Sequence, residues 1–151
     1  DRFGSAVAIN DDYAVVGAPL ARAGPAAEDH HGVAYVFERS GSTWSQVQRL
    51  SASHGYNQQQ FSHSLAISGN EIVIGSTYGA YIYTRCSGVW TETAYISGGS
   101  GDTTAQPNGL SFGNPVAIAS GRIAIGSTGE DPSGITNAGA AYIFEDPERT
   151  S

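Results

Sequence analysis

One cassette of apolar residues occurs three times in this chain, and this repetition constrains the fold more than any other feature. Each copy starts with a phenylalanine and reaches a glycine 14 residues later: Phe3 and Gly17, Phe61 and Gly75, and Phe112 and Gly126. Successive copies start 58 and 51 residues apart. Copies of one supersecondary unit form a repeat architecture, in which each unit buries its apolar surface against its neighbours. Function is therefore expected on the surfaces and loops of the array.

Each copy is predicted to form short antiparallel strands. The first copy has apolar runs at residues 6–9, 14–16 and 33–37, and turn-forming residues separate the first two runs. The runs show little alternation of polar and apolar residues, which is typical of strands buried on both faces. A more polar outer strand is predicted at residues 44–50, with a counterpart at 90–96. No segment has the periodicity of a helix.

Four antiparallel strands in each repeat describe the blade of a β-propeller. The alternative is a β-sandwich, which has no reason to repeat its sequence. We therefore predict an all-β fold, a partial β-propeller with blades at about residues 1–50, 51–100 and 101–151. The third blade is incomplete, because no tryptophan-bearing strand follows its third apolar run. A propeller closes with roughly four to eight blades, so the expected partners are remaining blades of a longer chain or neighbouring copies of itself.

Motifs at both ends of the first hairpin resemble the FG-GAP repeat. They are Phe3-Gly4 and Gly17-Ala18-Pro19, and the later copies depart from them at Ser62, Ser76 and Ser127. The resemblance is greatest to the calcium-free FG-GAP variety of microbial surface proteins and is more distant to the propeller of integrin α subunits. It covers essentially the whole chain. It implies a propeller that serves in binding or adhesion, with an extracellular or cell-surface location.

Aromatic residues recur at fixed places in the copies and are predicted to belong to the framework. The recurrent tyrosines and tryptophans are Tyr35, Tyr81 and Tyr142, and Trp44 and Trp90. Exposed aromatic rings would also suit a carbohydrate platform, but their fixed positions favour packing. The constant distance from phenylalanine to glycine further predicts that Phe3, Phe61 and Phe112 are buried at equivalent positions.

Composition excludes several classes of partner. The 151 residues carry a formal net charge of −7, which argues against nucleic acid because a phosphate backbone needs a basic surface. No apolar run approaches the roughly 20 residues of a membrane-spanning helix, so no membrane insertion is expected. Cys86 is the single cysteine and is either a bystander thiol or the site of an intermolecular disulfide. The chain starts at the repeat motif, and we expect a processed or partial segment.

Three segments carry side chains that a metal ion would need. The Asn-Asp-Asp turn at residues 10–12 is too short to present the six to eight oxygens of a calcium site, and its counterparts lack carboxylates, so no calcium or cofactor is expected. Two long loops carry the remaining candidates: Glu28, Asp29, His30 and His31, and then Glu130 and Asp131. Adjacent histidines diverge in an extended chain, which favours solvated acidic loops over a transition-metal site.

These loops join the second and third strands of their repeats, at residues 20–31 and 129–138, where the copies differ most in length. We expect them to carry the specificity of a non-enzymatic binding or adhesion module for a protein or glycan. The alternative is a structural protomer, or a repeated segment, of an extracellular oligomer or filament held by blade-to-blade or strand contacts. No serine elbow or phosphate-binding loop occurs, so an enzyme on this scaffold has the least support.

Overall fold

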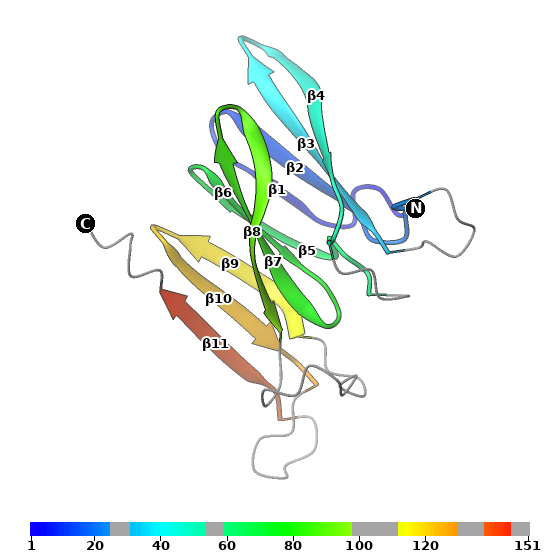
Figure 1. The fold of residues 1–151 in the computed structure, drawn as a ribbon, viewed down its shortest axis with the longest axis vertical. Coiled ribbons are helices and arrows are strands. Elements are labelled where there is room, and N and C mark those ends of the chain that lie inside the picture. The colour runs from blue at the N-terminus through cyan, green and yellow to red at the C-terminus, as the bar shows by residue number, and fades with distance from the viewer. Residues whose placement is uncertain (25–30, 54–58, 98–111, 130–137, 146–151) are drawn as a thin grey trace.

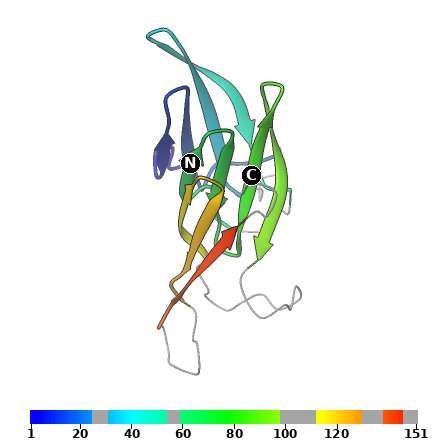
Figure 2. The same cartoon turned by 90° about the vertical axis from the view of Figure 1, so that its left-hand side faces the viewer.

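Three antiparallel sheets make up the fold in a computed structural model, which describes residues 1–24, 31–53, 59–97, 112–129 and 138–145. The sheets follow one another along the longest axis of the molecule, from the blue and cyan first sheet to the yellow and red third sheet (Figure 1). Seen after a 90° turn, the strands of all three sheets lie roughly along one axis (Figure 2). The described residues contain no helix, and hence none that would span a membrane. The predicted all-β partial propeller is confirmed.

Each sheet is a meander of strands in chain order. The first sheet consists of β1 (Val7–Ile9), β2 (Tyr13–Ala18), β3 (Val33–Ser40) and β4 (Thr43–Leu50). The second consists of β5 (Ser64–Ser68), β6 (Glu71–Gly75), β7 (Gly79–Cys86) and β8 (Val89–Ser97). The third consists of β9 (Phe112–Ala119), β10 (Arg122–Ser127) and β11 (Ala140–Glu145), and pairs in the order β11-β10-β9.

The strands lie where the apolar runs predict them. The copies also share the same pattern of strand pairing. The first two strands of every copy form a tight hairpin, with Ile9 opposite Ala14, Ser68 opposite Glu71, and Ala119 opposite Arg122. The outer pairs β3–β4 and β7–β8 carry a bulge at the same place, after Val36 and after Ile82. Equivalent residues of the repeats therefore occupy equivalent positions in space.

Apolar side chains between the sheets form two separate cores. The first core joins the facing surfaces of sheets one and two and includes Val15, Val36, Ile72 and Trp90. The second core joins sheets two and three around Val73, Ile82, Phe112 and Ile125. Because the second sheet contributes to both cores, its strands β6 and β7 are buried on both faces, as predicted.

The glycine that ends each hairpin has a packing role between repeats. A Cβ atom at Gly17 would overlap the carbonyl oxygen of Ser62, and one at Gly75 would overlap the carbonyl oxygen of Gly113. Ser62 and Gly113 directly follow the phenylalanines of the next copies, so the glycine of one repeat receives the phenylalanine turn of the next. The two recurrent motifs therefore pack against each other across the sheets.

One prediction about the phenylalanines is wrong in part. Phe61 and Phe112 are buried, with 0% and 2% of their surface exposed, but Phe3 is 60% exposed. Phe3 still makes the equivalent ring contact: its centre lies 5.5 Å from Tyr35, compared with 5.2 Å for Phe61 and Tyr81. Phe61 is buried because the first sheet covers it, whereas no described residue covers Phe3 in the same way. For the same reason β1 is largely exposed, contrary to the prediction of strands buried on both faces.

Candidate binding surfaces

The junction of the first two sheets shows how one repeat docks on the next. Trp90 is 2% exposed, and its ring meets Tyr13 edge-on with 5.4 Å between ring centres. The side-chain amide of Gln48 binds the backbone of Trp90 twice. Its Nε2 donates to the Trp90 carbonyl at 2.6 Å, and the Trp90 N–H donates to its Oε1 at 2.9 Å. An aromatic anchor and a matched pair of hydrogen bonds therefore hold the outer strand β8 against the preceding repeat.

A polar latch closes the same junction at the tight-turn end of the sheets. Arg85 lies over the ring of Tyr13, 4.9 Å from its centre, and donates to its hydroxyl at 2.9 Å. Arg85 also donates to Oδ1 of Asn70 from Nε at 3.1 Å and from its terminal nitrogen at 2.8 Å. The Tyr13 hydroxyl donates to Glu38 at 2.8 Å, and this hydrogen bond together with burial raises the pKa of Tyr13, against the opposing charge of Arg85. In this latch, formed by Tyr13, Glu38, Asn70 and Arg85, the charged guanidinium both stacks on the aromatic ring and donates hydrogen bonds.

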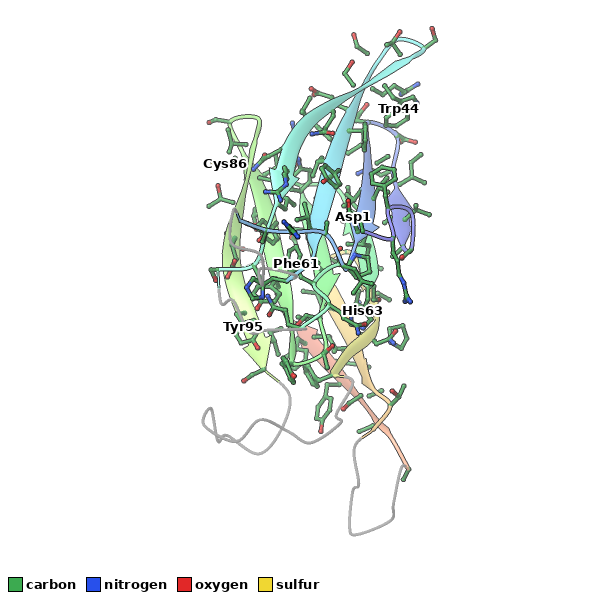
Figure 3. All side chains as sticks on the ribbon, turned by 90° about the vertical axis from the view of Figure 1, so that its right-hand side faces the viewer. Asp1, Trp44, Phe61, His63, Cys86 and Tyr95 are labelled. Carbon is green, nitrogen blue, oxygen red and sulfur yellow. The ribbon has the colours of Figure 1, made fainter. Side chains whose placement is uncertain are left out.

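The first sheet presents large apolar side chains on the face that looks away from the second sheet. They include Phe3, Val7, Ile9 and Trp44. Their equivalents one repeat later, Phe61, Leu65, Ile67 and Trp90, all pack into the core between sheets one and two. Trp44 lies toward the outer end of the first sheet, while Phe61 lies in the interior (Figure 3). The exposed face therefore carries the side chains with which a repeat docks on its predecessor.

The third sheet presents the opposite kind of face. A shallow hollow of about 720 Å³ is lined by small residues, including Pro115, Ala117, Ala124 and Ala141. Beside them Ile143 is 74% exposed. These positions correspond to those with which the first sheet receives the second. The molecule thus carries one projecting and one receiving apolar face, and an exposed apolar surface of this kind marks an interaction site.

Most of the predicted ligand-loop residues lie outside the described residues, namely Glu28, Asp29, His30, Glu130 and Asp131. His31 is described and is half-buried. Its carbonyl accepts a hydrogen bond from the N–H of Phe61 at 2.9 Å, so this end of the loop belongs to the junction between repeats. The prediction of a solvated acidic loop stays a prediction.

The turn at residues 10–12 uses its side-chain oxygen locally. Asn10 Oδ1 accepts from the N–H of Asp12 at 3.0 Å and of Tyr13 at 2.8 Å, which forms an Asx turn. Asp12 lies 4.0 Å from Arg39. The described residues contain no group of three or more histidine, cysteine, aspartate or glutamate residues that would hold a metal ion. The absence of calcium binding remains a prediction that calcium titration would test.

Sequence reasoning missed the role of Ser62, which it noted only as a departure from the repeat. Ser62 is fully buried with φ at +74°, in the positive range that glycine adopts more readily, and its counterparts Gly4 and Gly113 also have positive φ. Its hydroxyl donates to the Val33 carbonyl at 2.6 Å and accepts from the Ala18 N–H at 3.1 Å. The serine thus fastens the second repeat to two strands of the first. The departure from glycine was the only signal in the sequence.

The latch had a clearer signal, because its members recur. Arg39 and Asp12 stand at the positions of Arg85 and Asn70 in the preceding copy, and both arginines contact the hairpin turn of their own sheet. Cys86 ends β7 and is exposed, at the outer end of the second sheet (Figure 3). Exposure leaves both interpretations of this thiol open.

Comparison with protein families agrees with the repeated geometry. The FG-GAP repeat model matches residues 1–37, 44–84 and 90–144. Each matched segment covers most of the first three strands of one sheet, and the second and third segments also cover most of the outer strand of the sheet before it, β4 and β8 respectively. No curated protein matches the chain in sequence.

Proposed function

Because the chain belongs to the FG-GAP repeat family, we propose that it is a non-enzymatic binding or adhesion module of an extracellular or cell-surface protein. FG-GAP repeats typically occur in extracellular or surface proteins. They are compatible with a β-propeller that binds other molecules. The ligand would be a protein or a glycan, and the connections between second and third strands would select it.

The observation that carries this proposal is a constant framework with one variable connection. In an antiparallel meander, all connections between second and third strands lie at the same end of the sheets. The second copy closes this connection with a self-contained turn, in which Ser76 donates to the Gly79 carbonyl from both its N–H and its hydroxyl, each at 2.8 Å. The first and third copies have much longer segments there. Variable loops on a rigid base are the usual position of binding residues.

Loop shortening tests the proposal without disturbing the framework. The base of the first loop is already closed, because the N–H of Gly32 donates to the Ala21 carbonyl at 3.1 Å. We expect a variant with residues 24–30 replaced by an Asn-Gly turn to fold with an unchanged melting temperature, because it keeps Ala23, which packs against Ala18 and Val33. It should lose binding to the glycans or secreted proteins that the wild type captures on an array. Capture that does not depend on either long loop, or turnover of glycoside, ester or peptide substrates, would count against the proposal.

A second candidate function is that of a structural protomer. The observation in its favour is the pair of complementary faces, one with Val7 and Ile9 projecting and the other with a hollow beside Ile143. Two different faces make a heterologous contact, which closes into a ring or continues as a filament. Light scattering at micromolar concentration should then show large assemblies that Ile9→Asp and Ile143→Asp each dissolve. Val89→Asp, at the exposed start of β8 in the second sheet, is the matched control. A monomeric wild type would exclude this function.

A further inference from the structure

The outer strands of the first two sheets carry equivalent residues that reach the variable connections. In the first sheet Arg49 of β4 pairs with the recurrent Tyr35, and in the second sheet Tyr95 of β8 pairs with the recurrent Tyr81. Arg49 and Tyr95 therefore hold the same position one repeat apart. Each side chain contacts the connection between the second and third strands of its own sheet. The outer strand is thus in a position to influence the proposed ligand loops.

Arg49 holds the chain at the point where the first connection leaves its sheet. Its Nη1 donates to the Ala23 carbonyl at 3.3 Å, and its Nη2 donates to the Arg22 carbonyl. The base of the connection is closed just before these residues, because the N–H of Gly32 donates to the Ala21 carbonyl at 3.1 Å. The two residues that Arg49 holds are therefore the first two beyond the closed base.

The guanidinium group suits this task better than other cationic groups do. Its donors are fixed in one planar fork, so a single side chain can hold two successive carbonyls in a defined direction. A lysine ammonium carries all its donors on one nitrogen and fixes no such direction. Ala23 also packs against the small core of Ala18, Ala21 and Val33. Hydrogen bonds and apolar contact together fix the first part of the loop.

Tyr95 meets a connection of the other kind, a tight turn. Its hydroxyl donates to the Tyr78 carbonyl at 3.4 Å, and a Cβ atom at Gly79 would lie 2.5 Å from its ring. Its ring centre lies 4.6 Å from that of Tyr81, near the end of β8 (Figure 3). A flat ring therefore covers the tight turn, whereas the longer, forked side chain of Arg49 serves the long loop. The residue at this position matches the connection that it contacts.

We propose that Arg49 is the positioning residue of the first ligand loop. By holding the carbonyls of Arg22 and Ala23, it sets the direction in which the loop leaves the sheet and so prepares the loop for a protein or glycan. A loop that is already held at its base loses less conformational freedom when it binds. The consequence for binding rests on the proposed function, whereas the hold on the two carbonyls does not.

Trypsin tests the hold directly, because the Arg22–Ala23 bond is a trypsin site and its carbonyl is the one that Arg49 binds. Cleavage within a folded protein requires local opening, and its rate follows the population of the open state. Arg49→Gln should speed cleavage at this bond at least about fivefold, since two hydrogen bonds are lost. Arg49→Lys, which keeps the charge, should give an intermediate rate. Mass spectrometry of the digest identifies each cleaved bond.

Arg39→Gln is the matched control. Arg39 is an exposed arginine of the same sheet, and its Nε donates to the Asp11 carbonyl at 2.7 Å at the opposite end. This variant should leave cleavage at Arg22–Ala23 unchanged. Arg49 is also exposed, so neither variant should shift the urea midpoint. Cleavage after Arg85, within β7, reports any general loss of stability in the same digest.

The binding arm uses immobilised glycans and secreted proteins whose capture is lost when residues 24–30 are shortened. Arg49→Gln should raise the half-saturating concentration on these probes at least about threefold, because the loop is no longer prepared. Arg39→Gln should leave it unchanged. If the wild type captures no probe in a loop-dependent way, the proposed function fails, and cleavage still decides whether Arg49 holds the loop.

Three results would overturn the inference. They are unchanged cleavage at Arg22–Ala23 in Arg49→Gln, an equal acceleration of cleavage after Arg85, and faster cleavage with unchanged capture of the loop-dependent probes. If Arg49→Gln does not fold, Arg49→Lys decides by the same measurements.

Discussion

Replacement of Ser62 by alanine should destabilise the protein more than replacement by glycine, although neither residue has a hydroxyl. The hydroxyl bridges the Ala18 N–H and the Val33 carbonyl, which face each other across β2 and β3. All three groups lie in a buried region. A buried polar group without a partner costs about 1–3 kcal/mol. With two such groups left behind, Ser62→Ala should lose about 2–4 kcal/mol.

Glycine at the same position should recover part of that lost free energy of unfolding. The left-handed φ of +74° costs an L-residue about 1–2 kcal/mol. The greater freedom of glycine in the unfolded chain offsets about 0.4–1 kcal/mol of the gain. Ser62→Gly should therefore be roughly 1 kcal/mol more stable than Ser62→Ala, and still less stable than the wild type. The difference matters because glycine is what both other repeats carry.

Urea unfolding followed by tryptophan fluorescence measures these differences, and Trp90 at the same junction reports them directly. A loss of about 2–4 kcal/mol corresponds to a melting temperature lower by about 4–16 °C for a chain of this size. Ser5→Ala is the control, because its hydroxyl makes a similar 2.6 Å bond to the Arg2 carbonyl in an exposed position. It should change stability by less than about 0.5 kcal/mol. A Ser62→Gly variant more stable than the wild type would show that backbone strain outweighs the buried bridge and would refute the reasoning.

Three further predictions follow from the described contacts. Gln48→Ala should cost about 1–2 kcal/mol in urea unfolding, because both of its amide bonds to the backbone of Trp90 are lost; an unchanged midpoint would contradict it. Burial first, and then the nearby charge of Glu92, raise the pKa of Tyr83, so the folded state keeps a proton that the unfolded state loses above pH 10. Stability should therefore fall as pH rises above 10, and Tyr83→Phe should flatten that fall in melts between pH 8 and 11. Calcium at millimolar concentration should not shift the melting temperature relative to chelator, because Asn10 already accepts two backbone hydrogen bonds in its turn; a clear upward shift would contradict this.

Much of the fold could be predicted because its determinants are local and repeated. Turn residues and apolar runs set the hairpins, and three copies in register set the architecture. The burial of individual residues was harder to predict from the sequence, because it depends on which surface covers them. Phe3 and Phe61 hold the same position in their repeats, yet only the second has a sheet packed over it. Sequence alone assigns a residue to a position in the repeat and leaves the neighbour of that position undetermined.

The candidate surfaces show the same division. The aromatic framework was predictable, since every copy carries its phenylalanine and tyrosine. The hydrogen bonds that Ser62 and Gln48 make across the first junction were not, because each of these residues differs from its counterpart in another copy. Ser62 replaces a glycine and Gln48 replaces an alanine, and both reach across a junction.

The apolar core between neighbouring sheets recurs, but the polar contacts beside it differ from one junction to the next. This difference can determine which blade packs beside which. Tyr13 in the first copy meets Arg85 of the second, whereas the same position is Glu71 in the second copy and Arg122 in the third. Arg122 instead pairs with Glu145 of its own sheet at 2.8 Å. Apolar faces alone would accept any copy, so discrimination has to come from such unequal polar groups. A latch built on tyrosine and arginine specifies the first junction, and the ion pair on the third sheet offers a different partner to whatever docks there.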